Sequence, residues 1–595
     1  TDVHWGPLSG SDGGVPDLDG DPARIIAGVE IEADRAGSYV VEVVSDEAGV
    51  AAAPVEVDLE PGSSRIEVAV EIESPELWWP RGMGEPRLYR ARVQLRAGDA
   101  ASPAPVLDEA SSRFGLRTIE LITETDSIGE SFFFRINGRP MFARGANVVP
   151  LDHFTPRVDS ERYRALFDAA AHANMNMLRV WGGGIYETDL FYDLADERGI
   201  LIWQDFMFAN GLYPWDPDFL DSVRSEARDQ VRRLRDHPSL ALWCGNNEIA
   251  EGWANWGWQG AHGYSAADST EAWAGYRALF HGVLPEVLAE LDPGRPYWPS
   301  SPSIGWGHPE SLVRGDSHYW GVWWGLEPFE IYGEKVPRFA SEFGFQGYPD
   351  PGTLEAVVGE DDRWLGSPVM RAHQKHPTGV ETLRVYLERE LGVTGTARLL
   401  ERAGWSGRGP TDEDGVRDFA FLTQLLQARG MEVALRAHRM SPRTGGTLYW
   451  QLNDTWPVAS WSSLDHALRT KGLHYAARSA FAPVALGWSA EGGGVLSASD
   501  LESSLRGRVE YAYASPGEAV EGGVVEGAVL PGRGRVLALL PLRDLRPGTL
   551  VGARFVPVTR AGGVPSGEGE PLTRLTRVVG RWSDLDPHPE GSGVT

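Results

Sequence analysis

The sequence predicts a multidomain protein with a central (β/α)₈ barrel flanked by two immunoglobulin-like β-sandwiches. Its 595 residues exceed the usual size of a single domain. Apolar strands alternate with amphipathic helices in the middle of the chain, and short alternating strands separated by turn residues occupy both flanks. The expected parts are a flexible lead-in over 1–22, a sandwich over 23–125, the barrel over 126–483 and a second sandwich over 484–595.

The residue pattern in the first part of the chain changes near residue 23. Residues 1–22 are rich in Gly, Asp and Pro and show no periodicity, which predicts a flexible lead-in. Short alternating segments follow, separated by turn clusters such as Glu60-Pro61-Gly62, and this spacing is typical of a β-sandwich. The clearest of them are Tyr39–Val44, Arg65–Val70 and Tyr89–Leu95.

The middle of the chain contains eight candidate strands. They are Ala143–Leu151, Asn176–Gly182, Leu201–Phe206, Leu240–Gly245, Tyr297–Ser300, Gly315–Trp320, Arg338–Phe343 and Thr447–Leu452. Helical segments lie between most of them, namely Ser160–Ala173, Asp189–Arg198, Pro217–Arg235 and Ala272–Glu290. Eight such units favour a (β/α)₈ barrel, with residues 347–446 as a helical insertion. A doubly wound sheet is the rival, but no Gly-rich phosphate loop follows the first strand.

The last part of the chain returns to short strands. From Val484 onward, Gly and Val alternate with polar residues, as in Arg508–Tyr513 and Arg535–Leu540. This pattern predicts the second β-sandwich.

Composition excludes several classes of function. Acidic residues outnumber basic ones by 84 to 55, giving a net charge of −29, so we expect neither a nucleic-acid nor a membrane partner. No apolar run is long enough to span a bilayer. Cys244 is the single cysteine, which excludes an intrachain disulfide. Because the start TDVHWGPLSG carries no leader pattern, a cytoplasmic location is the expectation, although this start is also compatible with a processed end or a fragment.

Metal and cofactor chemistry find little support in the motifs. The 14 histidines include no HExxH pattern and no cluster with local ligand spacing, so we expect no metal site and no cofactor. A well-placed G-x-S-x-G elbow is absent as well. Cys244 lies in an apolar strand, which indicates a core residue rather than a nucleophile.

Two glutamates stand where a barrel carries its working residues, at the carboxyl ends of strands. Glu248 follows the fourth strand in LALWCGNNE, and Glu342 ends the seventh in RFASEFGFQ. A pair of carboxyl groups flanking one bond is what glycoside hydrolysis requires, with one proton donor and one ionised group. A short distance between the two carboxyl groups would give retention of configuration, and a longer one would give inversion. The alternative is that both glutamates only form salt bridges at the rim of the barrel.

Aromatic and polar residues surround these glutamates in the sequence. The chain has 23 tryptophans, and indole faces suit the C–H surfaces of sugar rings. Trp181 ends the second predicted strand, Trp450 lies in the eighth, and Trp256 follows Glu248 in EGWANWGWQ. His318 and Tyr319 precede the rim of the sixth strand, where a tyrosine hydroxyl could hold a catalytic carboxylate ionised. Asp205 ends the third strand and is a candidate for bonding a sugar hydroxyl or for capping the next loop.

Five segments carry a resemblance to a known family. In order they are FFFRINGRPMFARGANVVPLD, NMNMLRVWGGGIYE, LIWQDFMFA, HPSLALWCGNNE and RFASEFGFQGYP. Together they resemble the β-mannosidases of glycoside hydrolase family 2 over about residues 128–480. The resemblance implies that Glu248 is the acid/base, Glu342 the nucleophile and Asn247 the partner of the sugar 2-hydroxyl. It also implies that Trp181, Trp256, Tyr319 and Trp450 line the subsite of the terminal sugar.

The resemblance therefore implies a retaining exo-β-mannosidase acting on a terminal β-D-mannose, with a β-mannoside oligosaccharide or glycoside as substrate. Such enzymes usually begin with a further β-sandwich that contributes to the sugar pocket, and this chain opens after most or all of it. That difference leaves open a related exo-glycosidase for another β-sugar, such as a glucosaminide or galactoside. It also leaves open a non-catalytic carbohydrate-binding protein. A homo-oligomer is compatible with the sequence.

Overall fold

The computed structural model describes residues 2–5, 22–47, 49–98, 105–407, 409, 414–489, 493–540, 545–557 and 572–578. These residues form two compact units that are interleaved in sequence. Unit 1 comprises Thr1–Ile122, Phe134–Met141 and Asn176–Ser301, and unit 2 comprises Thr123–Phe133, Phe142–Met175 and Pro302–Thr595. Each unit is described by itself.

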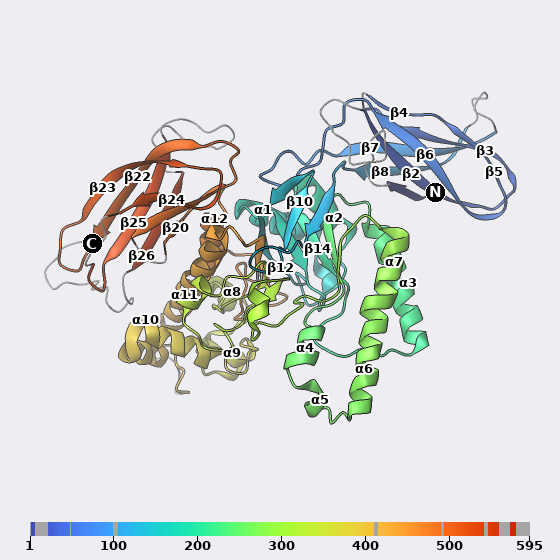
Figure 1. The fold of residues 1–595 in the computed structure, drawn as a ribbon. Helices are drawn as coiled ribbons and strands as arrows, with labels where there is room; N and C mark the ends of the chain where they lie inside the picture. Colours follow the sequence, from blue (N-terminus) through green and yellow to red (C-terminus); the bar gives the residue numbers. More distant parts are fainter. Residues whose placement is uncertain are drawn as a thin grey trace. The chain divides into compact units, whose positions relative to one another are not determined.

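Unit 1 begins with a β-sandwich (Figure 1, blue). One sheet has the order β1-β2-β6-β4 and the other β5-β3-β7-β8. Apolar side chains that alternate along β2 and β6, including Val29 and Val68, pack into the core with Tyr89 and Phe114 from the other sheet. The strands are β1 (Asp2–Trp5), β2 (Ala23–Ala33), β3 (Gly37–Val44), β4 (Val50–Ala52), β5 (Val55–Leu59), β6 (Gly62–Ile72), β7 (Tyr89–Ala97) and β8 (Val106–Phe114). Strands β2 to β8 fall within the range 23–125, and β1 precedes it.

Strand β1 corrects the expectation of a flexible lead-in for its four residues. Asp2–Trp5 pairs antiparallel with β2, with Trp5 opposite Ala27. The indole of Trp5 stacks on Phe114 at 4.1 Å between ring centroids and donates a hydrogen bond to Ser112 Oγ. Alternation of buried Val3 and Trp5 orders this segment, whereas the rest of the predicted lead-in lies outside the described residues.

The second part of unit 1 contains four parallel strands in the order β16-β15-β14-β13. They are β13 (Met177–Val180), β14 (Leu201–Asp205), β15 (Leu240–Cys244) and β16 (Tyr297–Trp298). The helices that follow them are α2 (Asp189–Arg198), α3 (Pro217–Leu234), α4 (Ile249–Asn255), α5 (Trp258–Ala261), α6 (Ala266–Ala278) and α7 (Leu284–Leu291). A π-helical turn, Leu279–Val283, joins α6 to α7. Helix α7 packs beside α3 (Figure 1). The short strands β9 (Ile119–Ile122), β10 (Phe133–Ile136) and β11 (Arg139–Met141) form a separate sheet.

Unit 2 contributes the other four parallel strands, in the order β12-β19-β18-β17. They are β12 (Ala143–Val148), β17 (Ser317–His318), β18 (Ala340–Glu342) and β19 (Gly446–Tyr449). Strands β12 and β19 pair in register, with Ala143 opposite Gly446. The helices are α1 (Ser160–His172), α8 (Pro351–Val357), α9 (Pro368–Ala372), α10 (Gly379–Arg402), α11 (Gly415–Met440) and α12 (Gly472–Ala480). All eight strands are members of one eight-stranded parallel sheet, as a (β/α)₈ barrel requires.

A second sandwich ends unit 2 (Figure 1, orange to red). Its sheets have the orders β20-β21-β24 and β23-β22-β25-β26 around a core that includes Leu486, Val509 and Phe555. The strands are β20 (Val484–Trp488), β21 (Gly494–Ser499), β22 (Leu505–Ala514), β23 (Glu521–Val529), β24 (Gly532–Leu539), β25 (Leu550–Pro557) and β26 (Thr573–Val578). Among the helices described in both units, none has the length and apolarity needed to cross a membrane.

Candidate active site

The predicted site residues fall into two groups, one in each unit. Trp181, Asp205, Asn247, Glu248 and Trp256 lie in unit 1. His318, Tyr319, Glu342 and Trp450 lie in unit 2. In both groups the key carboxylate stands at or just beyond the carboxyl end of a buried parallel strand, where barrel enzymes carry their working residues.

Glu248 occupies the turn between β15 and α4. It has a left-handed backbone, with φ 61° and ψ 10°, at the position that precedes the first residue of the helix. Its N–H donates to Ser301 O at 2.8 Å, and its carbonyl accepts from Gly252 N at 2.8 Å. Left-handed backbone at a residue with a β-carbon costs free energy and is concentrated at functional sites. The surrounding backbone hydrogen bonds therefore hold Glu248, which is largely buried, in this turn.

A line of polar side chains leads from β13 to the Glu248 carboxylate. Arg179 Nη2 lies 2.7 Å from Asn247 Oδ1. Asn247 Nδ2 lies 3.0 Å from Asn210 Oδ1, and Asn210 Nδ2 lies 2.8 Å from Glu248 Oε2. All three distances are those of good hydrogen bonds. The network joins residues that β13, the loop after β14 and the loop after β15 bring to one place.

Asp205 holds Arg179, the first residue of this network, in place. Its Oδ2 accepts from Arg179 Nη2 at 2.8 Å and from Gly182 N–H at 3.0 Å, and its Oδ1 accepts from Trp203 Nε1 at 3.0 Å. The Arg179–Asp205 ion pair is fully buried on both sides. These contacts indicate a structural role in holding Arg179, and the sugar hydroxyl suggested for Asp205 remains an untested prediction.

Glu342 ends β18 and is buried in unit 2. His318 Nδ1 lies 3.4 Å from Glu342 Oε2, and Tyr319 N–H donates to the Glu342 carbonyl at 2.8 Å. The strand is fixed by its neighbour Ser341, whose hydroxyl donates to Asp316 Oδ2 at 2.6 Å and whose carbonyl accepts from Asn147 Nδ2 at 2.9 Å. The structure therefore brings two of the predicted site residues, His318 and Glu342, into contact.

Tyr319 corrects one expectation. Its hydroxyl was expected to donate to the catalytic carboxylate, but it donates to Glu327 instead. Burial and the bond to Glu327 raise the pKa of Tyr319 above its ordinary value, so the hydroxyl keeps its proton. Strand β17 ends at His318, and this places the histidine rather than the tyrosine beside Glu342.

The predicted aromatic residues differ in exposure. The ring of Trp181 lies so close to Gly183 that a β-carbon there would meet ring atoms at 2.1 Å, so only glycine fits. Trp256 is 43% exposed and packs edge-to-face on Trp258, which leaves indole surface available to a ligand. Trp450 directly follows β19, and its N–H donates to Phe343 O at 2.9 Å. Their roles in sugar binding stay predictions.

Comparison with known proteins now defines the family. The β-D-mannosidase of Dictyoglomus thermophilum is 32% identical in sequence and superposes with a TM-score of 0.83, covering 98% of this chain and 67% of that one. The chain belongs to glycoside hydrolase family 2. Its fold is the expected (β/α)₈ barrel flanked by β-sandwiches.

Further comparisons agree with this family 2 membership. The profile of "Glycosyl hydrolases family 2" matches residues 15–117. "Beta-mannosidase B" of Aspergillus fumigatus is 36% identical over 78% of this chain, and it is 53% covered. The chain thus spans about half the length of the curated relatives it matches. Amycolatopsis orientalis exo-chitosanase CsxA, at 17% identity and a TM-score of 0.72, shares the fold, with 97% of this chain and 63% of that one covered.

Two residues that hydrogen-bond the candidate site residues Asn247 and Glu248 were missed by the sequence analysis. Arg179 is a charged residue in the middle of a wholly buried strand, MLRV, and such a residue signals a buried partner. Asn210 lies five residues beyond the end of β14 and has φ 51°, but nothing in its local sequence indicates a bond to Glu248. Only the fold brings the two loops together.

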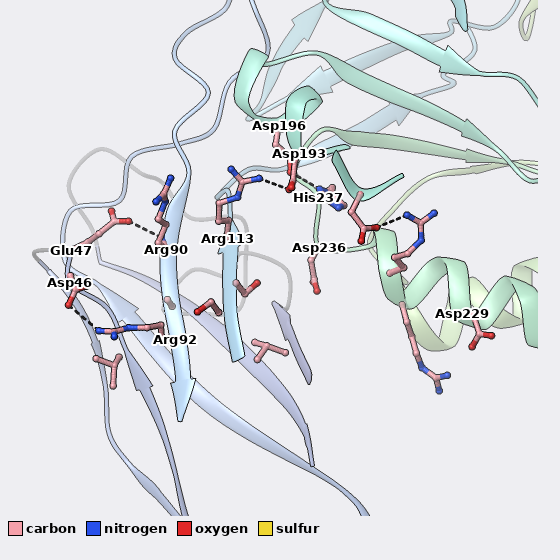
Figure 2. Close-up of a pocket in the computed structure, with 18 residues that line it drawn as sticks. Asp46, Glu47, Arg90, Arg92, Arg113, Asp193, Asp196, Asp229, Asp236 and His237 are labelled. Atoms are coloured by element: carbon pink, nitrogen blue, oxygen red, sulfur yellow. Dashed lines mark hydrogen bonds and ion pairs between the residues drawn. The ribbon is translucent and has the colours of Figure 1, made fainter. Parts of the chain in front are cut away.

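A cavity of about 1100 Å³ lies elsewhere on unit 1 of this family 2 chain (Figure 2). It is lined by charged side chains of β7, β8, α2 and α3, and none of the predicted site residues is among them. Asp193, Asp196 and His237 are close enough together to hold a cation. However, Arg113 pairs with Asp193, and Asp196 bonds both His237 Nδ1 at 2.6 Å and Ser239 N–H at 3.0 Å. The group is accounted for as a structural ion network.

Proposed function

We propose that the chain is a retaining exo-β-mannosidase that removes terminal non-reducing β-D-mannose by double displacement. The observation that carries the proposal is the likeness to the Dictyoglomus thermophilum β-D-mannosidase, because it extends over 98% of this chain and so includes both glutamate-bearing strands. The burial of Glu248 and Glu342 supports it further, since partly desolvated carboxyl groups can differ in protonation.

In the first step, a Glu342 oxygen attacks the anomeric carbon while the bond to the leaving-group oxygen breaks. Glu248 gives its proton to that oxygen, so the aglycone leaves as a neutral alcohol. In the second step, Glu248 takes a proton from water as the water oxygen attacks the same carbon, and the bond to Glu342 breaks. Mannose then leaves with its β configuration retained.

Asn247 is suited to bond the sugar 2-hydroxyl. One hydrogen of its Nδ2 is used by Asn210 Oδ1, and an amide nitrogen carries a second hydrogen for a ligand oxygen. A hydrogen bond to the 2-hydroxyl strengthens as the oxocarbenium-like transition state forms. His318, at 3.4 Å from Glu342 Oε2, contributes to holding the nucleophile in its attacking position.

The test compares initial rates on aryl β-mannoside, β-glucoside, β-galactoside and β-glucosaminide, with Glu342→Ala as the blank. We expect hydrolysis of the mannoside, its loss in the blank, and β-mannose as the first product seen by NMR. Cleavage of a different sugar would replace the mannoside assignment, and α-mannose would overturn the retaining mechanism. Binding without turnover would favour a carbohydrate-binding protein.

Glu248→Ala tests the acid role separately. An activated aryl mannoside needs no proton for its leaving group, whereas a disaccharide does. We expect the variant to lose about 10²–10⁴-fold on the disaccharide and far less in the glycosylation of the aryl substrate, measured as kcat/KM. Equal losses on both substrates would contradict the acid role.

A further inference from the structure

We propose that Arg179, Asn247 and Asn210 form a one-way line of hydrogen-bond donors that fixes which oxygen of Glu248 carries the catalytic proton. Asn210 is then a positioning residue that acts through Glu248. The inference rests on the proposed acid/base role of Glu248 and adds to it the atom, Oε1, from which the proton is delivered.

The direction of the line follows from the donors and acceptors available. A guanidinium group can only donate, so the atom of Asn247 that faces Arg179 Nη2 at 2.7 Å is Oδ1. The amide nitrogen of Asn247 therefore faces Asn210, whose Oδ1 accepts from it at 3.0 Å. This in turn leaves Asn210 Nδ2 as the group 2.8 Å from Glu248 Oε2. No amide in the line can flip without placing a donor against a donor.

The origin of the line is fixed as well. Asp205 accepts from Arg179 Nη2 at 2.8 Å and from Nε at 3.2 Å, and both side chains are fully buried. The two parallel hydrogen bonds hold the guanidinium group of Arg179 in one orientation. Backbone bonds hold the two amides, with Asn210 N–H donating to Asn247 O at 3.0 Å.

The consequence concerns the two oxygens of Glu248. Oε2 accepts a hydrogen bond from Asn210, and a protonated carboxyl oxygen is a weaker acceptor than its unprotonated partner, so a proton on Oε2 would weaken that bond. The acid form is thus held with its proton on Oε1. Because Asn210 donates to the carboxylate, it also stabilises the ionised form that must take a proton from water in the second step.

Two substitutions of Asn210 separate this role from simple packing. Asn210→Gly removes the amide and suits the backbone, since φ is 51° there. Asn210→Asp keeps the shape and the acceptor for Asn247 but replaces the donor that faces Oε2 with an oxygen. That oxygen favours a Glu248 proton on Oε2, shared between the two carboxyl groups, which is the wrong oxygen for catalysis.

We expect Asn210→Asp, which preserves the shape of the side chain, to reduce activity more than Asn210→Gly does. For Asn210→Gly we expect the apparent pKa of the basic limb of the kcat/KM pH profile to rise by about one unit. We also expect the rate on the disaccharide to fall about tenfold. For Asn210→Asp we expect this apparent pKa to rise further and the rate on the disaccharide to fall about a hundredfold or more. In both variants the activated aryl mannoside loses less than the disaccharide.

Asn174→Gly is the matched control, because Asn174 also has a left-handed backbone, at φ 59°, and lies outside this network. We expect its pH profile to match that of the unchanged chain. A greater loss in Asn210→Gly than in Asn210→Asp, or an unmoved basic limb in both, would overturn the proposal. If Glu248→Ala still shows its selective loss on the disaccharide, the acid role stands although the donor line fails. If Glu248→Ala shows no such loss, the proposed function fails first.

Discussion

Glu248 and Asn210 share a left-handed backbone, with φ 61° and φ 51°. Such conformations cost residues with a β-carbon on the order of 1–3 kcal/mol and persist only where the surrounding structure fixes them. Here the Glu248 N–H bonds Ser301 O, and the Asn210 N–H bonds Asn247 O. Glycine at position 210 relieves this cost, so a loss of activity in that variant reports on the missing amide rather than on a distorted turn.

His237 makes the stability of unit 1 depend on pH. Burial disfavours its charged form, but the carboxylates of Asp196, at 2.6 Å, Asp193 and Asp236 together outweigh burial and raise the pKa of His237 above its ordinary value. A histidine whose folded-state pKa is raised stabilises the fold fully below its unfolded pKa and loses this contribution as the pH rises through the folded pKa. We therefore expect the free energy of unfolding lost in His237→Gln to be larger at pH 6 than at pH 8, measured by urea titration.

His262→Gln serves as the control for that measurement, because His262 is exposed. Its effect on the free energy of unfolding should be small and equal at both pH values. A difference for His237→Gln that grows with pH would contradict the pairing with Asp196.

At the residue scale, the sequence predicts the two glutamates but not the side chains that hold them. Glu248 and Glu342 are predictable because each follows an apolar strand, and their chemistry is recognisable from residue type. Asn210, which bonds Glu248, lies in a loop whose position depends on tertiary packing. The same holds for Glu327, which accepts the Tyr319 hydroxyl that was expected to serve Glu342. A local pattern therefore gives the reacting groups, while their hydrogen-bond partners require the fold.

At the scale of elements, helix α3 depends on its first residues. Asp216 precedes the helix, and its side chain accepts from Phe219 N at 3.0 Å. We expect Asp216→Ala to cost about 1 kcal/mol of unfolding free energy, because one backbone N–H in the first turn loses its acceptor. Faster hydrogen exchange at Phe219 N–H would locate the effect.

Helix α2 provides the comparison. Thr188 occupies the equivalent position before α2, but its side chain makes no capping hydrogen bond. Thr188→Ala should therefore change the free energy of unfolding much less than Asp216→Ala does. Equal losses in the two variants would show that capping is not the cause.

The expected helix Ala272–Glu290 shows that the boundaries of helices and strands are harder to predict from the sequence than their presence. The structure extends the helical segment from Ala266 to Leu291 through a π-helical turn. It begins earlier because Ser265 and Asp268 cap each other's backbone N–H groups, a signal in the sequence that apolar periodicity does not reveal. The strand expected over Ala143–Leu151 is shorter in the structure, where the ladder ends at Val148. Val149 and Leu151 remain buried beyond its end, so their apolar character resembles that of a strand.

At the scale of the whole molecule, Cys244 offers a single reporter of opening. It is the chain's single cysteine, and it is fully buried in β15 between β14 and β16. A thiol reagent can reach it only when this part of the sheet opens. We expect one thiol to react after unfolding in urea and labelling to be slower by orders of magnitude in buffer.

A peptide containing the same cysteine gives the reference rate for that measurement. Labelling of the folded chain at the rate of the peptide would mean that β15 opens readily under native conditions. The expected result would instead make labelling a measure of the stability of the four-stranded ladder of unit 1.

The architecture of the whole chain was predicted more completely than its division into compact units. Eight strands and two sandwiches follow from periodicity, and all eight strands are confirmed within a few residues of their expected ends. The interleaving of the units was not predictable, because it depends on which helices and strands make the most mutual contacts. β1 was missed because its four residues are ordered by tertiary contacts, namely pairing with β2 and the packing of Trp5 on Phe114.

The register of β12 has a consequence for synthesis on the ribosome. Its ladder partner β19 begins about three hundred residues later in the chain, with Ala143 opposite Gly446. At elongation rates of about 5–20 residues per second, this partner emerges roughly 15–60 s after β12 does. During that interval β12, which is wholly buried in the finished fold, lacks one of its two neighbouring strands and is accessible to other nascent chains and to chaperones. We therefore expect the speed of translation between these two strands to influence the yield of native protein.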